Sequence, residues 1–259
     1  IGLTGIRAAL ALAACATPVA LGFVLPVLVL LRLLGQELAS ADAHFPLARF
    51  ARSATVSVEL AAIAALLAAL LAAAFLFALR TRPSLSLRWA VRVISLGYAV
   101  PGAVIAVGVL IPLTWLQQRV PQWSASALVT GTVFGVLYAY QVRFSAVALQ
   151  SLEAGYARIP PSVDETARML GVSRWRILLE LHVPLLRRAT LASLLLVFVD
   201  VMKELPATLL LRPFNSDTLA VVAYQLARDE RLGEAALPSL AIVLVGLVPV
   251  VLLSRAIRR

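Results

Sequence analysis

Apolar residues fall into six long stretches that are separated by short polar segments. Each stretch holds about 20 residues or more, the length that an α-helix needs to cross the hydrocarbon core of a bilayer. Because a chain inside the bilayer must satisfy its own backbone hydrogen bonds, the pattern predicts a helical bundle. We therefore expect an all-α fold, a polytopic membrane bundle of about six helices. The predicted spans are residues 8–34, 54–79, 91–116, 125–149, 189–211 and 236–253.

Composition agrees with the pattern. Hydrophobic residues make up 61% of the 259 residues and charged residues only 14%, which leaves too little polar surface for a soluble domain of this size. The first apolar stretch is too long for a signal-peptide core, so it is counted as a span. The loops are too short to form another domain. We expect one transmembrane domain over residues 1–259, with a core at 53–253.

The formal net charge is +10. In a soluble chain this charge suggests nucleic acid, but no polar face here interleaves basic and aromatic residues, so nucleic acid is not an expected partner. With the N-terminus placed inside, the inner segments hold about twice as many arginines as the outer ones. Because basic residues favour cytoplasmic loops, both termini are predicted to be cytoplasmic, and so is the polar stretch at residues 158–188.

That stretch, hereafter the polar segment (residues 158–188), predicts two short helices joined by a glycine. Pro160 and Pro161 stop the preceding span. Ser162 stands three residues before Glu165, which is the spacing of a capping box. Asp164 and Glu165 fall in the first turn, where the helix dipole favours negative charge. The first helix is therefore expected to begin at Ser162.

The same segment contains signals for where its helices end. Gly171 is expected to end the first helix, because glycine adopts the left-handed C-cap backbone freely. Ser173 can start a second short helix and Pro184 is expected to limit it. Two interpretations of this elbow stay open from the residues alone: a docking surface for another protein, or an ordered loop without a partner.

The polar segment resembles the cytoplasmic EAA loop of permease subunits in ATP-binding-cassette importers. That motif is Glu-Ala-Ala, three residues, Gly, nine residues and an apolar-x-apolar-Pro end. Here Glu165-Thr166-Ala167 is followed after three residues by Gly171, and after nine more by Leu181-His182-Val183-Pro184. The spacing matches throughout, and Thr166 departs from the motif by replacing its middle alanine.

The resemblance implies a function, a site and partners. The first helix of such a loop lies in a groove of the ATPase and transmits its motion. It implies a type I importer permease in the bacterial inner membrane, with an ATPase dimer, a periplasmic binding protein and a second permease half as partners. The residues expected to dock the ATPase are Asp164, Glu165, Thr166, Ala167 and Gly171.

Other stretches resemble the ferric-iron branch of these permeases, and they include residues 202–214, 234–238 and 97–102. Permeases for thiamine, polyamines and phosphonates are similar enough to remain alternatives. Permeases of the iron branch are commonly two six-helix halves fused in one chain. A chain that opens at Ile1 resembles the C-terminal half of such a protein, and a homodimeric half-size subunit is the alternative.

Enzymatic chemistry is not expected in this chain. Its single lysine, Lys203, follows Met202 inside a span, so no Gly-Lys-Ser or Gly-Lys-Thr P-loop exists. We predict no cofactor and no metal site, because Cys15 is the only cysteine and the two histidines, His44 and His182, stand far apart. The ATPase is expected to be a separate subunit.

Charged residues inside the fifth span suggest a path for solute. Asp200, Lys203 and Glu204 share one face of a continuous helix by their spacing. Ionisable groups at membrane depth usually face a bundle interior or a wet cavity. We assign this face, with Tyr98, to the translocation path, while an Asp–Lys or Lys–Glu pair that fastens the span to its neighbour is the alternative. Arg143 lies nearer the end of its span and is expected to reach the interface.

An ion-coupled secondary transporter is the rival of another class. It would use Asp200 and Glu204 as proton or cation sites. Such transporters usually contain inverted repeats, and the sequence shows none. This rival also gives no role to the polar segment.

Overall fold

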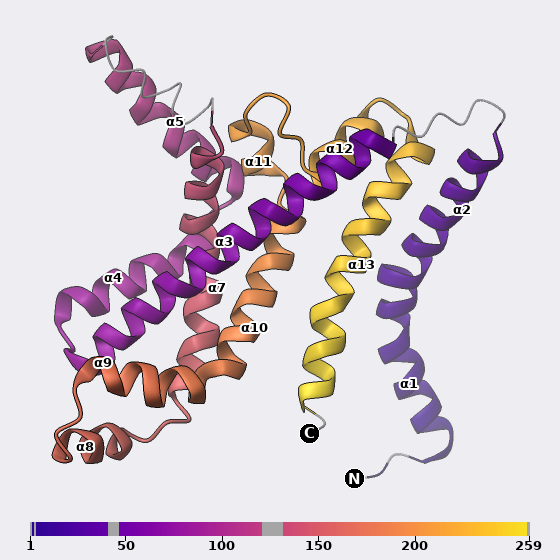
Figure 1. Cartoon of the computed structure of the whole chain (residues 1–259). Helices are drawn as coiled ribbons and strands as arrows, with labels where there is room; N and C mark the ends of the chain where they lie inside the picture. The colour runs from indigo at the N-terminus through magenta and orange to yellow at the C-terminus, as the bar shows by residue number, and fades with distance from the viewer. Residues whose placement is uncertain (1, 3, 41–46, 121–131, 258–259) are drawn as a thin grey trace.

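The computed structural model describes residues 2, 4–40, 47–120 and 132–257. All regular structure in this part of the chain is helical, as Figure 1 shows. Three of its helical stretches are long and apolar enough to cross a membrane. Two further helices, which are bent relative to each other, are long and apolar enough when they are counted as one span. The prediction of an all-α, polytopic membrane bundle is therefore confirmed.

The first predicted span is one helical stretch made of α1 (Gly5–Val19), η1 (Ala20–Val24) and α2 (Leu25–Ala39). Its middle part, η1, is a wider π-helical turn in which the N–H of Leu25 bonds to the carbonyl of Ala20. Pro26 follows at once. A proline has no N–H and its ring crowds the carbonyl four residues back, so the wider turn lets the helix continue past it.

The second and sixth predicted spans are continuous helices that extend beyond the predicted ends. They are α3 (Leu47–Thr81) and α13 (Leu232–Ile257). A further helix, α12 (Leu219–Arg228), lies in what the apolar pattern assigned to a loop. It is short, and the side chain of Thr218 caps it by accepting the N–H of Val221.

The third predicted span is not one helix. It consists of α4 (Leu85–Leu96), a 3₁₀ turn at Gly97–Ala99 and α5 (Gly102–Arg119), and the two helices are bent by 116°. Pro101 lacks an N–H and disfavours helical backbone before it, which ends the first helix. A Cβ on Gly97 would lie 1.9 Å from the carbonyl oxygen of Val142. Glycine is therefore needed for this turn to rest on the neighbouring helix.

The fourth and fifth predicted spans have shifted boundaries. The fourth is α7 (Phe134–Tyr156), and the predicted residues 125–131 lie outside the described chain. The fifth is split into α10 (Val183–Met202) and α11 (Pro206–Leu211). Both α7 and α10 carry charged residues within the bilayer-length helix, and neither is among the three helices that pass the test of length and hydropathy.

The core lies where α3 crosses α7 and α10. The buried face of α3 is a stripe of small residues, so the backbones approach closely without a gap to fill. Val197 and Val201 of α10 and Ala139 of α7 are buried in the same cluster. The stripe has the spacing of one helical face and consists of Ala61, Ala64, Ala65, Ala68 and Ala72.

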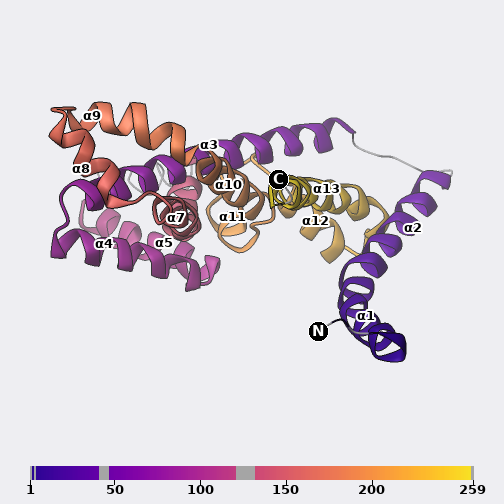
Figure 2. The ribbon, with the colours of Figure 1, turned by 90° about the horizontal axis from the view of Figure 1, so that it is seen from below.

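The polar segment forms α8 (Pro161–Met169), α9 (Arg174–Arg176) and η3 (Ile177–His182). Figure 1 shows α8 and α9 on the same side of the bundle as the start of α1 and the end of α13, whereas α11 and α12 lie on the opposite side. Seen along the bundle in Figure 2, α8 and α9 lie at one end of the molecule and α1 and α2 at the other. The arrangement agrees with termini and polar segment sharing one side.

We expect Gly97→Ala to destabilise the protein by about 2 kcal/mol, because the added methyl group collides with backbone that cannot move aside. Thermal unfolding of the purified protein in detergent measures this change. Gly108→Ala is the matched control, since nothing lies within 4 Å of its Cβ position inside α5. That control should be neutral or slightly stabilising, and equal stability of both variants would contradict the prediction.

Candidate functional site

The first helix of the polar segment begins and ends by different means. Helix α8 starts at Pro161, which needs no N–H in the first turn, and no side chain caps it. The predicted capping box of Ser162 and Glu165 is therefore wrong. The predicted glycine cap is confirmed: Gly171 has a φ of +74° and its N–H bonds to the carbonyl of Arg168. The N–H of Val172 reaches the carbonyl of Ala167, which completes a Schellman motif.

The second helix begins where expected but does not end at Pro184. Ser173 is its N-cap residue, and the chain then runs through α9, η3 and α10 without a break. The element before the proline, η3, is again a π-helical turn, and the N–H of Val183 bonds to the carbonyl of Leu178. The wider turn accommodates Pro184 as η1 accommodates Pro26. The polar segment is thus joined rigidly to the fifth span.

A buried ion pair attaches α8 to the end of α3. The guanidinium Nε of Arg80 donates to Asp164 Oδ2 at 2.5 Å. Its Nη2 donates to the carbonyls of Ile159 and Pro160, at 2.8 and 3.0 Å. The exposed fraction of the Asp164 side chain is only 5%. Arg80 therefore bonds both to α8 and to the turn that precedes it.

The other oxygen of Asp164 contacts a histidine. His182 Nε2 lies 2.8 Å from Asp164 Oδ1, and His182 Nδ1 lies 3.3 Å from the hydroxyl of Tyr156. An ionised carboxylate only accepts, so Nε2 carries the proton and donates to Asp164. The hydroxyl of Tyr156 can then donate to Nδ1. His182 is fully buried, and the rings of Phe77 and Tyr156 meet it edge-on.

These contacts set the ionisation of Asp164. Burial alone raises its pKa, but the hydrogen bonds from Arg80 and His182, together with the charge of Arg80, outweigh burial and hold the pKa below its ordinary value. A carboxyl whose folded-state pKa is depressed stabilises the fold above its unfolded pKa of about 3.9. That contribution is lost as the pH falls through the folded-state pKa, so α8 stays attached at neutral pH.

The predicted docking residues divide between two faces of α8. Asp164 and Ala167 are buried against the chain's own helices, so neither side chain is open to a partner in this conformation, and the assignment of the docking residues stays a prediction. Glu165 and Thr166 are exposed, and so is Gly171 at the helix end. Beside them the segment exposes large apolar side chains, although it projects from the polar end of the bundle. They are Met169, Leu170, Trp175 and Leu179.

The predicted path residues meet at a cavity of about 240 Å³. Tyr98, Asp200, Lys203 and Glu204 all line it. The prediction that the three charged residues share one face of a continuous helix is wrong, because α10 ends at Met202 and α11 begins at Pro206. Charge is instead gathered at the break between two helices, beside the bend of the third span.

Glu204 is almost completely buried and uses both carboxylate oxygens. Oε1 accepts the N–H of Ala207, and Oε2 accepts the N–H and the hydroxyl of Thr208, at 3.0, 3.0 and 2.7 Å. The carboxylate thus satisfies the first N–H groups of α11. Arg143 Nη1 of α7 reaches Oε1 at 3.2 Å. Arg143 therefore turns inward, and its predicted position at the interface is wrong.

The charged cluster contains the Asp–Lys pair of the alternative interpretation, whereas the assignment to the translocation path stays a prediction. Lys203 Nζ pairs with Asp200 Oδ1 at 2.8 Å, within the end of α10. Glu204 fastens the break to α7 through Arg143. Gly102 of α5 permits this packing, because a Cβ there would lie 2.5 Å from both Arg143 and Glu204. The side chain of Lys203 is half-exposed at the cavity although its ammonium pairs with Asp200, whereas both carboxylates are mostly buried.

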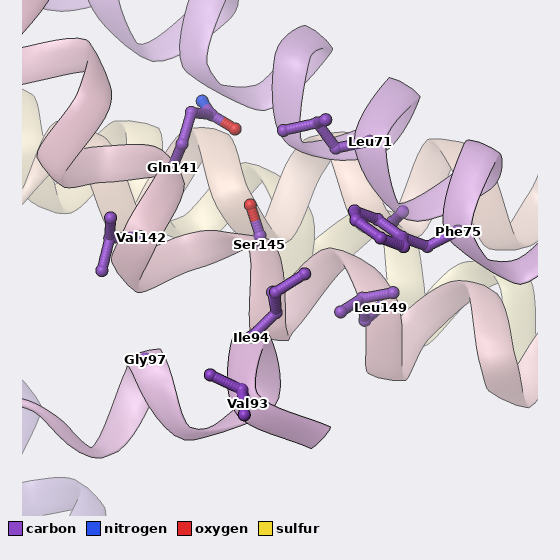
Figure 3. A pocket seen from close by; sticks show the side chains of 10 residues that line it. Leu71, Phe75, Val93, Ile94, Gly97, Gln141, Val142, Ser145 and Leu149 are labelled. Atoms are coloured by element: carbon purple, nitrogen blue, oxygen red, sulfur yellow. The ribbon is translucent and has the colours of Figure 1, made fainter. Parts of the chain in front are cut away.

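A second cavity, of about 290 Å³, lies between α3, α4 and α7 (Figure 3). Its walls are mainly apolar side chains such as Leu71, Phe75 and Ile94, with the polar groups of Gln141 and Ser145 among them. The Nε2 of Gln141 donates to the carbonyl of Ala64, while its buried Oε1 has no partner among the described residues. Such a lining offers no charge to a charged solute. The described residues also contain no group of three or more metal-ligating side chains, and His44 lies outside them.

These features define a class of protein. The chain is a multi-pass membrane protein with a rigid polar segment at one end and a charged cavity at a broken span, and transport permeases are built in this way. The chain belongs to the family described as binding-protein-dependent transport system inner membrane component, which matches residues 65–259. It is accordingly a permease of the ATP-binding-cassette importers, and not their ATPase.

Two relatives differ in the solute that they name. The chain is 27% identical over 172 residues to the putative 2-aminoethylphosphonate transport system permease protein PhnV of Salmonella typhimurium, covering 66% of this chain and 62% of that protein. It is 29% identical over 178 residues to the Fe(3+)-transport system permease protein FbpB 2 of Haemophilus influenzae, covering 69% and 33%. The chain thus spans less than two thirds of each relative.

A solved structure shares the fold. A chain of the bacterial alginate ABC transporter, in complex with an alginate pentasaccharide-bound periplasmic protein, superposes with a TM-score of 0.69. The comparison covers 95% of this chain and 93% of that chain at 16% identity. A second structure of a bacterial alginate importer gives 0.60 at 14% identity. At this identity the similarity shows the fold alone.

Sequence reasoning missed the three residues that surround Asp164, namely Arg80, Tyr156 and His182. Of these, only His182 carried a signal, because it stands between Leu181 and Val183 in the apolar-x-apolar-Pro end of the EAA-like pattern. Arg80 lies 84 positions from Asp164 and Tyr156 lies 26 positions from His182. The packing of α3 against α7 brings them together.

We expect Glu204→Gln to destabilise the protein by about 3 kcal/mol. An amide cannot accept at both ends, so one N–H of α11 and the charge of Arg143 lose their partner in a buried place. Chemical unfolding in detergent measures the change. Lys203→Gln is the control on the adjacent residue, where loss of a half-exposed pair should cost about 0.5 kcal/mol. Equal costs would show that Glu204 has no structural role.

Proposed function

We propose that this permease carries a small solute across the bacterial inner membrane, driven by an ATPase that docks on its polar segment. One observation supports this most. The inner face of α8 is locked to the bundle by Asp164, while its outer face presents Glu165 and the apolar side chains of Met169 and Leu170. A rigidly mounted, partly apolar surface suits a protein partner that has to move the bundle.

The proposal includes the partners and the orientation. An ATP-binding-cassette ATPase dimer docks on the polar segment, which is the cytoplasmic coupling loop, and both ends of this chain are cytoplasmic. A periplasmic binding protein delivers solute on the other side. A second permease half, fused or as another copy, completes the path. The arginine asymmetry supports this orientation.

The translocation path runs past the cavity at the break between α10 and α11. The cavity lies beside a broken span, where non-helical backbone is tolerated only against protein or water. Tyr98 and Lys203 stand at its edge with half-exposed side chains. ATP-driven closure of the ATPase dimer would move the two permease halves relative to each other and open this cavity to one side of the membrane at a time.

Ferric iron is the first candidate solute, because residues 202–214 resemble the iron branch and FbpB 2 is a relative. The second candidate is a phosphonate, and a specific observation favours it. Both carboxylates at the cavity already have cationic partners, while Lys203 is half-exposed and Arg143 Nε has no partner among the described residues. Basic side chains at the wall suit an oxyanion.

The rival ion-coupled mechanism has little support at this cavity. A proton or cation site needs a carboxylate that can change its partner during transport. Both oxygens of Glu204 are held by backbone N–H groups and by the side chains of Thr208 and Arg143. Glu204 is therefore not free to change partners in this conformation, so we assign it a structural role.

We expect Glu165→Arg to abolish stable association with the ATPase while the permease itself stays folded. Glu165 is exposed on α8, so the change reverses a charge at the proposed contact without affecting the fold. Copurification from a coexpressed importer measures association. Asp229→Arg is the control, because it reverses an exposed carboxylate at the end of α12, on the opposite side of the bundle. Undiminished association of the Glu165 variant would remove α8 from the interface.

The two candidate solutes predict opposite effects at the cavity. For ferric iron, Asp200→Asn should lower ATP-dependent uptake about tenfold, because the neutral amide no longer attracts the cation, and Lys203→Met should not. For 2-aminoethylphosphonate, Lys203→Met should lower uptake about tenfold and Asp200→Asn should not. Uptake of each radiolabelled solute by cells that express the complete importer distinguishes them. Equal uptake by wild type and both variants would place the path elsewhere.

A further inference from the structure

The contacts of α8 involve two spans at once. Asp164 Oδ2 is bound by Arg80 at the end of α3, and Asp164 Oδ1 is bound by His182 of η3, which continues into α10. Tyr156 at the end of α7 touches the same histidine. The carboxylate of α8 is therefore bound by two side chains, Arg80 of α3 and His182 of η3, and Tyr156 of α7 is linked to it through His182.

The contacts are buried, which distinguishes them from the other ion pair of the polar segment. The exposed fractions of the Arg80 and Asp164 side chains are 18% and 5%. In the Arg176–Glu180 pair they are 67% and 56%. Separating a buried pair leaves an uncompensated charge, whereas an exposed pair gives way to water at little cost. Only the buried pair can resist a pull on α8.

We propose that Arg80, Asp164, His182 and Tyr156 form a clamp that makes α8 move as one body with α3, α7 and the start of α10. The four are positioning residues for transport, since none of them needs to touch solute or ATP. The inference rests on the proposed docking of an ATPase at α8, and it states which contacts carry the motion onward.

Helix α3 connects the clamp to the opposite side of the bundle. It has 35 residues, which corresponds to about 50 Å of helix. At its other end the hydroxyl of Ser57 accepts the N–H of Leu219 at 2.8 Å, at the start of α12, and Arg49 pairs with Asp217 at 3.6 Å. A movement imposed on α8 is thereby passed to the loops on the other side of the bundle.

The test uses Asp164→Asn in the complete importer, with Glu180→Gln as the matched control. Both changes remove one carboxylate charge from an arginine pair of the same segment, but only the first pair is buried. We expect solute transported per ATP hydrolysed to fall about fivefold or more in the Asp164 variant and to stay within about 1.5-fold of wild type in the control. A ratio that is unchanged in both variants would overturn the clamp.

A second measurement does not depend on transport or on a known solute. Hydrogen–deuterium exchange of the permease in detergent should show amide exchange over residues 161–171 at least about tenfold faster in Asp164→Asn, with α3 and α7 unchanged. Arg80→Lys should give an intermediate increase, because an ammonium keeps the charge but loses the fork that binds the carboxylate through Nε and the two carbonyls through Nη2. Unchanged exchange over α8 in both variants would also overturn the proposal.

The outcomes separate this inference from the proposed function. If the wild-type permease does not associate with an ATPase, the proposed function and the clamp's role in transport both fail. If it associates and transports while Asp164→Asn keeps the wild-type ratio, only the clamp fails. Loss of association in Asp164→Asn but not in Glu180→Gln, with faster exchange over α8, would support the clamp.

Discussion

A charge inside a helical bundle must be compensated by its immediate neighbours, and both sites of this permease are built on that constraint. Asp164 is surrounded by Arg80 and His182, and Glu204 by Arg143 and the first N–H groups of α11. In a medium of low dielectric constant such partners are held firmly, because separation exposes an unpaired charge. Each carboxylate therefore fixes the position of a helix that packing alone would leave adjustable.

The two carboxylates lie at opposite ends of α10. Asp164 joins the polar segment to α3 and to the helix that continues into α10, and Glu204 holds the break at which α10 ends. Between them α10 packs on the alanine stripe of α3. Small residues leave few interlocking side chains along the middle of the two helices. Polar contacts at the helix ends therefore fix how the helices are aligned.

The proline positions show why helix ends were hard to locate from local signals. Pro26 and Pro184 both follow a π-helical turn and the helix passes through them, whereas Pro206 begins a new helix after a true break. A proline removes one N–H in every case. Whether the chain widens its turn or stops depends on what packs around it, and at Pro206 the carboxylate of Glu204 provides the alternative partner for the freed backbone.

The sequence by itself determined the class of fold, the membrane location of the apolar stretches, the glycine cap at Gly171 and the resemblance to importer permeases, because hydropathy, length and local backbone preference act within a few residues. It also indicated the residues that line the charged cavity. Only the tertiary structure decided that Asp164 faces inward, that Glu204 pairs with Arg143, and that His182 and Arg80 share one carboxylate. These contacts join residues up to 84 positions apart, and the crossing of α3 with α7 and α10 brings them together. The local sequence pattern therefore could not predict these contacts.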